Sequence, residues 1–134
     1  MTAFSLKIVT PDGLAFDGQA EELIVRTTSG DMGIMAGHIN CVASLGMGRA
    51  TIVVDGKRRY AACIGGMLSV VDGKVTLVPT TFEWADQIDL SRAERSEQKA
   101  QQILADKQTV QADLRVAEAR LKRALVRKSV AQIK

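Results

Sequence analysis

The sequence predicts an α+β fold in which a mainly β body precedes a helical tail. Glycines and prolines, which mark turns, are confined to the body: all eleven glycines lie between Gly13 and Gly73, and the two prolines are Pro11 and Pro79. The last aromatic residue is Trp84. After it the chain is built almost entirely from residues that favour helices, so a strand-forming segment gives way to a helical one.

Charge changes at the same point. Residues 1–87 carry seven Lys and Arg against nine Asp and Glu, a net charge of −2, whereas residues 88–134 carry eleven against six, a net charge of +5. We therefore assign a β domain to residues 1–87 and a helical domain to residues 88–134. A basic helix beside an acidic body predicts an acidic partner for the helix.

Short strands separated by regular turn signals predict that the body is a β-sandwich or a flattened barrel. Period-two alternation and hairpin spacing predict strands at 4–9, 22–27, 50–54, 57–64, 68–71 and 74–78. Asp-Gly pairs, which accept positive φ, predict turns at 12–13, 17–18, 55–56 and 72–73. Residues 29–33 are predicted to form a loop, and the pair Gly65-Gly66 to mark a bulge or a close backbone approach.

The tail offers two possible helix starts. Asp89 can cap a helix that begins at Leu90, or residues 91–94 can form a capping box, and the sequence does not choose between them. Two narrow apolar stripes follow, separated by the polar residues 106–109. The tail therefore folds as two antiparallel helices or runs as one helix of about 65 Å, at ~1.5 Å per residue.

The residues of catalysis and metal binding are scarce. His38 is the one histidine, and a loop histidine bonded to backbone is the simplest interpretation because no second group accompanies it. Cys41 and Cys63 are expected to be small buried side chains. We predict a chain that is not an enzyme and binds no metal.

The sequence also bears on location. No apolar run approaches the ~20 residues that cross a bilayer, and the N-terminus lacks the pattern of a signal peptide. We expect a cytosolic or plastid-stromal chain that lies peripheral to a membrane.

A basic cluster occupies the end of the tail. Its members are Arg115, Arg120, Lys122, Arg123, Arg127 and Lys128. The cluster is either a solvated helix face or a surface for nucleic acid or an acidic protein. The tail has no aromatic residue for base stacking, so an acidic protein fits as well or better. One interpretation of the chain is thus a small β-sandwich binding module whose basic helical tail docks on nucleic acid or an acidic protein.

Five segments, in order along the whole chain, resemble the epsilon subunit of bacterial F-type ATP synthases. They are residues 9–13 (VTPDG), 30–38 (GDMGIMAGH), 64–70 (IGGMLSV), 88–93 (IDLSRA) and 119–124 (ARLKRA). The resemblance implies an N-terminal β-sandwich of antiparallel strands followed by a two-helix antiparallel hairpin. It also implies a noncatalytic subunit of the central stalk.

The resemblance implies particular partners for the sandwich. The sandwich would bind the gamma subunit and rest on the c-ring of the membrane rotor, with Asp31 and His38 on the surface that faces the ring. Met35-Ala36 replaces the family's usual Leu-Pro, so this segment is expected to be less rigid. The subunit would lie at the cytoplasmic face of a bacterial membrane without inserting into it, and a plastid thylakoid is the alternative.

The resemblance also implies a regulatory role for the hairpin. Extended along the catalytic head of alpha and beta subunits, it would inhibit ATP hydrolysis, and no nucleic acid would be involved. The residues that would meet acidic groups of the beta subunits are Arg115, Arg120, Lys122, Arg123 and Lys128.

No cofactor is required by the resemblance, but some members of the family bind ATP as a regulatory ligand. The matching residues here are Glu83, Ile88, Asp89, Arg92, Ala93, Arg123 and Arg127. One departure concerns Val116, which stands where ATP-binding members carry arginine, while Arg115 is displaced by one position. The alternative interpretation is that Asp89 only caps the helix and pairs with Arg92.

Overall fold

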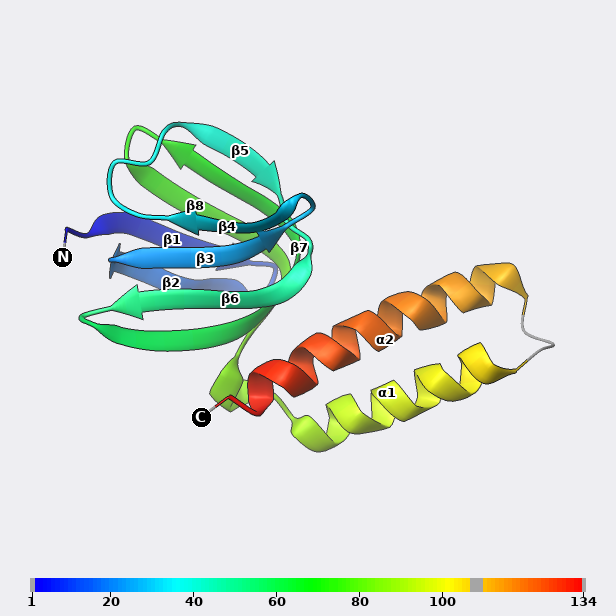
Figure 1. Cartoon of the computed structure of the whole chain (residues 1–134). Helices are drawn as coiled ribbons and strands as arrows, with labels where there is room; N and C mark the ends of the chain where they lie inside the picture. Colours follow the sequence, from blue (N-terminus) through cyan, green and yellow to red (C-terminus); the bar gives the residue numbers. More distant parts are fainter. Residues whose placement is uncertain (1, 107–109, 134) are drawn as a thin grey trace. The chain divides into compact units, whose positions relative to one another are not determined.

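The computed structural model describes residues 2–106 and 110–133 (Figure 1). The chain forms two compact units that divide between Trp84 and Ala85. The division proposed from the sequence, between residues 87 and 88, falls slightly later. The difference arises because Ala85–Gln87 form a short 3-10 helix, η1, that contacts a helix of the second unit.

The first unit is built from eight strands in its described part. They are β1 (Phe4–Thr10), β2 (Gly13–Ala20), β3 (Glu22–Thr27), β4 (Gly30–Ile34), β5 (Cys41–Ser44), β6 (Met47–Val54), β7 (Lys57–Val71) and β8 (Lys74–Trp84). They form one continuous sheet in the order β2-β1-β8-β7-β6-β3-β4, with β5 also paired to β7.

The sheet folds over on itself into a sandwich because β7 and β8 are long enough to serve both layers (Figure 1). The first half of β7 pairs with β6, and its second half pairs with β5. One layer is therefore β2-β1-β8-β7-β5 and the other is β8-β7-β6-β3-β4. These pairings confirm the predicted β-sandwich.

One pair departs from the expected antiparallel arrangement. β1 and β8 run parallel, with Leu6 opposite Val75 and Ile8 opposite Leu77. Nearly the whole body separates these strands in the sequence, so no hairpin turn imposes the antiparallel direction on them.

The double glycine lies where β7 passes from one layer to the other. Ile64 pairs with Thr81 and Gly66 with Pro79. Gly66 has a φ of +99°, and a Cβ added to it would lie 2.0 Å from the carbonyl oxygen of Val78. Only glycine fits so close to another backbone, which confirms the predicted close approach.

Three of the Asp-Gly turn predictions are confirmed and one is wrong. Turns separate the strands at 11–12, 55–56 and 72–73, and Gly13, which follows the first turn, begins β2. Asp17 and Gly18, in contrast, lie inside β2, opposite Lys7 and Leu6 of β1. The neighbouring strand supplies hydrogen-bond partners, and Lys7 supplies an opposite charge for Asp17, so the chain continues as a strand.

Two further predictions about the strands are wrong. The loop predicted at residues 29–33 is largely strand β4, because residues 30–34 pair with β3 through a tight turn. The strands predicted separately at 57–64 and 68–71 are one strand, β7. In both cases the glycines that suggested a break are accommodated within a paired strand.

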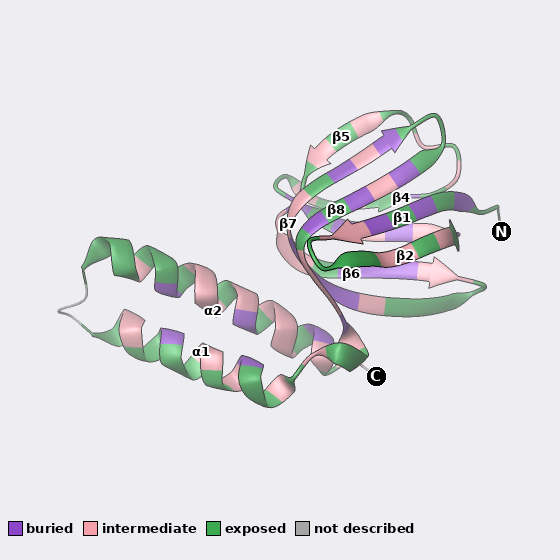
Figure 2. Ribbon diagram, turned by 180° about the vertical axis from the view of Figure 1, so that it is seen from behind, coloured by how far each residue is buried: buried purple, intermediate pink, exposed green. Residues whose placement is uncertain are grey.

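The core lies between the two layers of the sandwich, as the purple segments of Figure 2 show. Its fully buried side chains include Leu6, Ile8, Leu23, Val25, Ile34, Ile52, Leu68 and Leu77. Cys63 is buried as predicted, whereas Cys41 is only half-buried. Cys41 begins β5, which pairs with β7 alone and so forms an edge of its layer.

The second unit is a helical hairpin of α1 (Leu90–Ala105) and α2 (Gln111–Ala131), which run antiparallel (Figure 1). This confirms the hairpin and excludes the single long helix; the polar residues 107–109 lie outside the described residues. The backbone N–H of Arg92 donates to Asp89 Oδ1 at 3.0 Å, so Asp89 is the cap and Ser91 is not.

Small side chains form the buried stripe of the hairpin, seen as purple bands in Figure 2. They are Ala93 and Ala100 of α1 with Ala117, Ala124 and Val130 of α2. Leu125 is 44% exposed, because it lies about 100° around the helix from Ala124.

Candidate functional site

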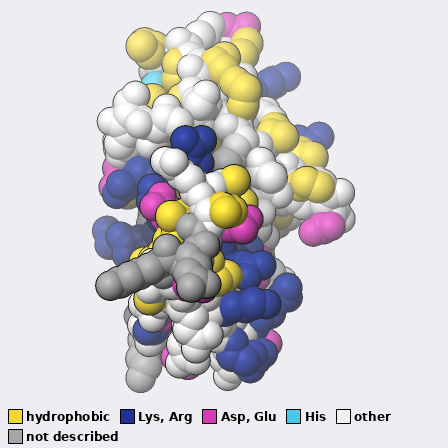
Figure 3. Space-filling model, turned by 90° about the vertical axis from the view of Figure 1, so that its right-hand side faces the viewer, with side chains coloured by type: hydrophobic (Ala, Val, Ile, Leu, Met, Phe, Trp, Pro, Cys, Tyr) yellow, Lys and Arg dark blue, Asp and Glu magenta, His cyan; other side chains and the backbone are white. Residues whose placement is uncertain are grey.

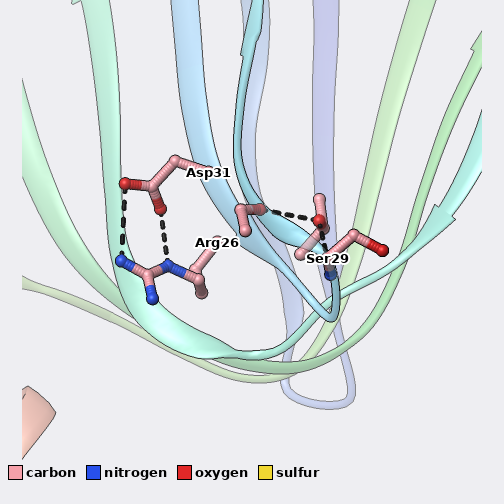
Figure 4. Close-up of polar contacts among 5 residues, drawn as sticks. Arg26, Ser29 and Asp31 are labelled. Atoms are coloured by element: carbon pink, nitrogen blue, oxygen red, sulfur yellow. Dashed lines mark hydrogen bonds and ion pairs between the residues drawn. The ribbon is translucent and has the colours of Figure 1, made fainter.

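The best-defined polar contact of the first unit joins Arg26 to Asp31 across the β3–β4 hairpin (Figure 4). Arg26 Nε donates to Asp31 Oδ1 at 2.6 Å, and Arg26 Nη2 donates to Oδ2 at 3.4 Å. The guanidinium therefore grips both carboxylate oxygens, which fixes their orientation. The side chains are 51% and 58% exposed, so the pair belongs to the surface.

The contact also affects the arginine. The hydrogen bonds to Asp31, followed by its negative charge, raise the pKa of Arg26 above its ordinary value. Because arginine is already fully charged at physiological pH, the pair stays ionic there.

The turn beside this pair is held by its own side chains. Thr27 Oγ1 donates to the carbonyl oxygen of Gly30 at 2.7 Å, and it accepts from the backbone N–H of Ser29 at 3.1 Å (Figure 4). These bonds close the turn on a single conformation, so Asp31 enters β4 in a defined register opposite Arg26.

Asp31 and His38, which the resemblance assigns to one ring-facing surface, do not meet. Asp31 is near the start of β4, whereas His38 lies in the segment that follows Ile34 at the other end of that strand (Figure 1). The strand that separates them is extended, so each residue belongs to a different end of the sandwich.

His38 is held by backbone groups, as predicted. The backbone N–H of His38 donates to the carbonyl oxygen of Met35 at 3.2 Å, and the ring nitrogen Nδ1 lies 2.8 Å from the carbonyl oxygen of Ile39. Cys41 Sγ lies 4.0 Å from the same nitrogen. Met35 and Ile39 beside it are 49% and 77% exposed, so this end of the sandwich presents apolar tips around the histidine.

The basic residues of α2 occupy several sides of the helix. Arg120, Arg123 and Arg127 recur at intervals of three and four residues and share one face. Arg115 and Lys122 are exposed and, seven residues apart, share another. Figure 3 shows dark-blue Lys and Arg side chains gathered in the lower half of its view, with fewer acidic side chains among them.

Lys128 is directed toward the other helix. Its Nζ lies 3.1 Å from Glu97 Oε2, and the two side chains are 34% and 14% exposed. In the folded hairpin Lys128 is therefore engaged by a carboxylate of the same chain.

The residues proposed for ATP are divided between the two units. Glu83 lies on β8 of the first unit, and the other residues of the set lie in the second. Within the second unit, Asp89 receives the N–H of Arg92, and Arg123 and Arg127 share one face of α2. Val116 is 62% exposed, so at this position the surface carries an apolar side chain and no charge.

The sequence did not predict Arg26 as a functional residue. Its signal was present: an arginine and an aspartate of opposite charge lie at matching distances from a Gly-containing turn. The two residues are recognised as neighbours only if residues 30–34 are known to pair with β3 as a hairpin. Because residues 29–33 had been predicted to be a loop, the pair was missed.

An exposed apolar face was missed as well. Met67 and Val78 are directly opposite on β7 and β8, and they are 48% and 47% exposed. Val71 lies on the same side of β7 and Val42 on the neighbouring β5, and they are 51% and 65% exposed. Figure 3 shows yellow hydrophobic side chains that reach the surface. Such a face is typical of a protein that binds another chain.

Among the described residues, no group of three His, Cys, Asp or Glu side chains is placed to hold a metal ion. None of the helices in residues 2–106 and 110–133 is long and apolar enough to cross a bilayer.

A β-sandwich with an exposed apolar face, followed by a basic helical hairpin, defines a two-domain protein that assembles with other chains. The family description "ATP synthase, Delta/Epsilon chain, beta-sandwich domain" matches residues 3–85, and "ATP synthase, Delta/Epsilon chain, long alpha-helix domain" matches residues 86–132. The chain belongs to the delta/epsilon chain family of ATP synthases.

Similar proteins agree with this assignment and with the resemblance to epsilon subunits. The chain is 43% identical to the ATP synthase epsilon chain of Ruminococcus albus over 136 residues, which cover the full length of both chains. It is 40% identical to that of Bacillus cytotoxicus over 134 residues, again over the full length of both. These relatives favour the epsilon subunit over the alternative of a nucleic-acid-binding module.

Solved structures share the fold. One is a chain of the Euglena gracilis mitochondrial ATP synthase, with a TM-score of 0.85 at 20% identity, which covers 96% of this chain and 81% of that chain. Another belongs to the Tetrahymena thermophila mitochondrial ATP synthase, with a TM-score of 0.66 at 14% identity, which covers 96% of both chains.

Proposed function

We propose that this chain is a noncatalytic subunit of the central stalk of an F-type ATP synthase. In this role the sandwich couples the catalytic head to the membrane rotor, and the hairpin regulates ATP hydrolysis. The observation that carries the proposal is the match of both domains to the delta/epsilon family, together with the similarity of the whole chain to epsilon chains over their full length.

The apolar face of β5, β7 and β8 supports a permanent partner for the sandwich. Met67, Val78, Val71 and Val42 together expose apolar side chains that gain free energy when another protein covers them. The proposed occupant is the gamma subunit, which turns with the rotor. The c-ring would be met by other groups. Because Asp31 and His38 lie at different ends of the sandwich, Asp31 is the proposed contact and His38 is the alternative, for a ring that faces the other end.

The hairpin has the properties of a mobile brake. Its buried stripe is made mainly of alanines, each of which buries little apolar area at ~25 cal/mol per Å², so separation of α1 from α2 costs little. Its basic residues, including Arg115 and Lys122 on the outer face, would then meet acidic groups of the catalytic beta subunits beside the alpha subunits.

Deletion of residues 88–134 tests the brake. The truncated chain, assembled with the complete complex, should raise the rate of ATP hydrolysis while it still binds the stalk. An unchanged hydrolysis rate in a complex that contains the truncated chain would overturn the brake and leave the stalk assignment standing.

ATP is proposed as a regulatory ligand of the folded hairpin. Arg123 and Arg127, which share one face of α2, would meet the phosphates together with Arg92 at the start of α1. A calorimetric titration of the full chain with ATP tests this proposal. Saturable 1:1 binding that Arg92→Ala abolishes and Arg95→Ala retains supports it, and no heat at millimolar ATP overturns it.

The proposed location follows from these partners. The subunit would lie at the cytoplasmic face of a bacterial cell membrane, bound to the rotor without inserting into the bilayer, with a plastid thylakoid as the alternative. Fractionation tests it: the chain should remain with washed membranes that keep the complex and leave membranes from which the head and stalk are stripped.

A further inference from the structure

The side chain of Arg26 packs over two glycines, Gly46 and Gly48, which lie just before and just after the start of β6. A Cβ added to Gly48 would lie 2.5 Å from Arg26 Cβ and 3.0 Å from its Cγ. A Cβ added to Gly46 would lie 3.2 Å from the carbonyl oxygen of Thr27 and 3.4 Å from the same Cγ. Neither glycine has a positive φ. Space for Arg26 explains the glycine at position 48, whereas at position 46 the backbone of Thr27 limits the space as well.

The two ends of Arg26 are therefore held. Its stem lies against the backbone of the β6 region at Gly46 and Gly48, and its guanidinium grips Asp31 with two hydrogen bonds. An exposed ion pair usually moves among several geometries, which is why such pairs contribute little to stability. In this pair the packing of the Arg26 stem on the two glycines and the two hydrogen bonds from its guanidinium to Asp31 select one geometry. A fixed geometry favours a role in recognition.

We propose that Arg26 is a positioning residue for Asp31, and that the Arg26–Asp31 pair, not the aspartate alone, is the group that contacts the membrane rotor. The inference rests on the proposed function, which assigns Asp31 to the surface that faces the c-ring. It adds a residue that the resemblance did not name and changes the chemistry of the contact.

The chemistry of the pair defines the partner surface. The pair has no net charge, so it does not attract a lone cation as an isolated carboxylate would. A guanidinium has five N–H donors, of which the two bonds to Asp31 use two, and each carboxylate oxygen can accept further bonds. The fitting partner is a polar loop of low net charge that offers both carbonyl acceptors and N–H or O–H donors.

The test measures binding of the full chain to membranes that retain the gamma subunit and the c-ring but have been stripped of this chain. Arg26→Met keeps the stem and removes the charge, Arg26→Lys keeps the charge and removes the fork, and Asp31→Asn removes the acceptor charge. We expect each variant to bind about fivefold more weakly, because the pair is exposed and the interactions of exposed charges are modest. The double variant Arg26→Met with Asp31→Asn should be no weaker than either single variant, because the two residues act as one unit.

Other outcomes separate this inference from the proposed function. Weaker binding of Asp31→Asn with unchanged binding of Arg26→Met would overturn the inference and retain Asp31 as a rotor contact. Losses that multiply in the double variant would also overturn it, because the residues would then act independently. Unchanged binding in all variants would overturn both the inference and the rotor contact of Asp31.

A matched pair of glycine variants tests the positioning directly. Gly48→Ala leaves both charged groups intact but places a methyl group against the Arg26 stem, so it should weaken binding as Arg26→Met does. Gly33→Ala, on β4, meets nothing within 4 Å and should bind as the parent chain does. Equal binding of the two glycine variants would overturn the positioning role. If Gly48→Ala does not fold by circular dichroism, the charge variants decide.

Discussion

The ammonium group of Lys128 lies 3.1 Å from Oε2 of Glu97 and joins the last turn of α2 to α1. The Glu97 side chain is only 14% exposed, so its carboxylate depends on this partner more than a surface carboxylate would. The same lysine was expected to meet acidic groups of the catalytic subunits. It can do so only after the contact with Glu97 is broken, so the ion pair opposes the extended state.

Removal of the lysine should therefore destabilise the folded hairpin. Lys128→Met is expected to cost roughly 1–2 kcal/mol, because it leaves a largely buried carboxylate without its cation, and Glu97→Gln is expected to cost less. Urea unfolding followed by helical circular dichroism measures both. Glu118→Gln, an exposed acidic residue of α2, is the control, and an equal effect of the Lys128 and Glu118 variants would contradict the role of the pair.

The double glycine of β7 should tolerate no side chain at its second position. In Gly66→Ala the new methyl carbon would lie 2.0 Å from the carbonyl oxygen of Val78 and 2.7 Å from the Cα of Pro79, at a φ of +99°. The loss of stability is expected to exceed ~4 kcal/mol, because backbone atoms cannot yield as a flexible side chain can. Soluble yield and thermal unfolding measure it, and Gly33→Ala serves as the control. A stable Gly66→Ala chain would show that β7 and β8 can separate here.

Arg59 should stabilise the end of the sandwich through Trp84. Its guanidinium carbon lies 3.7 Å from the centroid of the Trp84 ring, and Phe82 meets the same ring edge-on at 4.9 Å between centroids. Arg59→Met is expected to cost about 1 kcal/mol and to shift tryptophan emission to longer wavelength, since the ring loses its cover. Arg58→Met, at an exposed neighbouring position, should change neither. Identical spectra for the two variants would argue against the stacking.

The two cysteines should differ in reactivity. Burial raises the pKa of the Cys63 thiol from its ordinary value of 9.0 to about 12, so the folded chain keeps it protonated. In a Cys41→Ser chain, Cys63 should react with dithiodipyridine at pH 8 only after unfolding, whereas in a Cys63→Ser chain the half-buried Cys41 should react in the folded state. Rapid reaction of Cys63 in the folded Cys41→Ser chain would contradict the burial of Cys63.

The same shift predicts a dependence of stability on pH. The unfolded chain ionises Cys63 more readily than the folded chain does, so ionisation favours unfolding. The stability that the protonated Cys63 thiol contributes to the folded chain is complete below pH 9, and it is lost as the pH rises from about 9 to about 12. The denaturant midpoints of the parent and Cys63→Ser chains should therefore converge across that range. A constant difference between the two midpoints would contradict this dependence on pH.

The cap of α1 separates two interpretations of Asp89. Because Asp89 Oδ1 accepts from the Arg92 N–H at 3.0 Å, Asp89→Ala should reduce helix stability by about 1 kcal/mol. Ser91→Ala, at the alternative cap that the structure rejects, should have a much smaller effect. Helicity in urea measures both variants. If an Asp89→Ala chain kept its stability but lost ATP binding, the main role of Asp89 would be to bind ATP and not to cap the helix.

Much of the fold could be predicted because local signals and tertiary structure agree. The Asp-Gly pairs at 55–56 and 72–73 adopt the positive φ that their turns need, and each joins two strands that pair directly. The helical tail could be predicted for the same reason, whereas the sequence left two alternatives open both for its hairpin and for its Asp89 cap, and the structure decided each of them. Prediction went wrong at 17–18 and 29–33, where a partner strand supplies the hydrogen bonds that outweigh turn-favouring residues.

The candidate sites divide in a similar way. Asp31, His38 and the basic residues of α2 were named from motifs, since each motif is continuous in the sequence. Arg26 was not, because its connection to Asp31 depends on the register of the β3–β4 hairpin and on the space above Gly48.

The sequence by itself determined the two-domain organisation, the family, and the chemistry that each end of the chain carries. Periodicity, turn residues and charge act over a few neighbouring positions, and all of these can be read along the chain. The tertiary structure alone decided which charges are paired: Asp31 with Arg26 across one hairpin, and Glu97 with Lys128 across the other. Ion pairs act over a few ångströms in space, so pairing is set by strand register and helix packing, which no local pattern specifies.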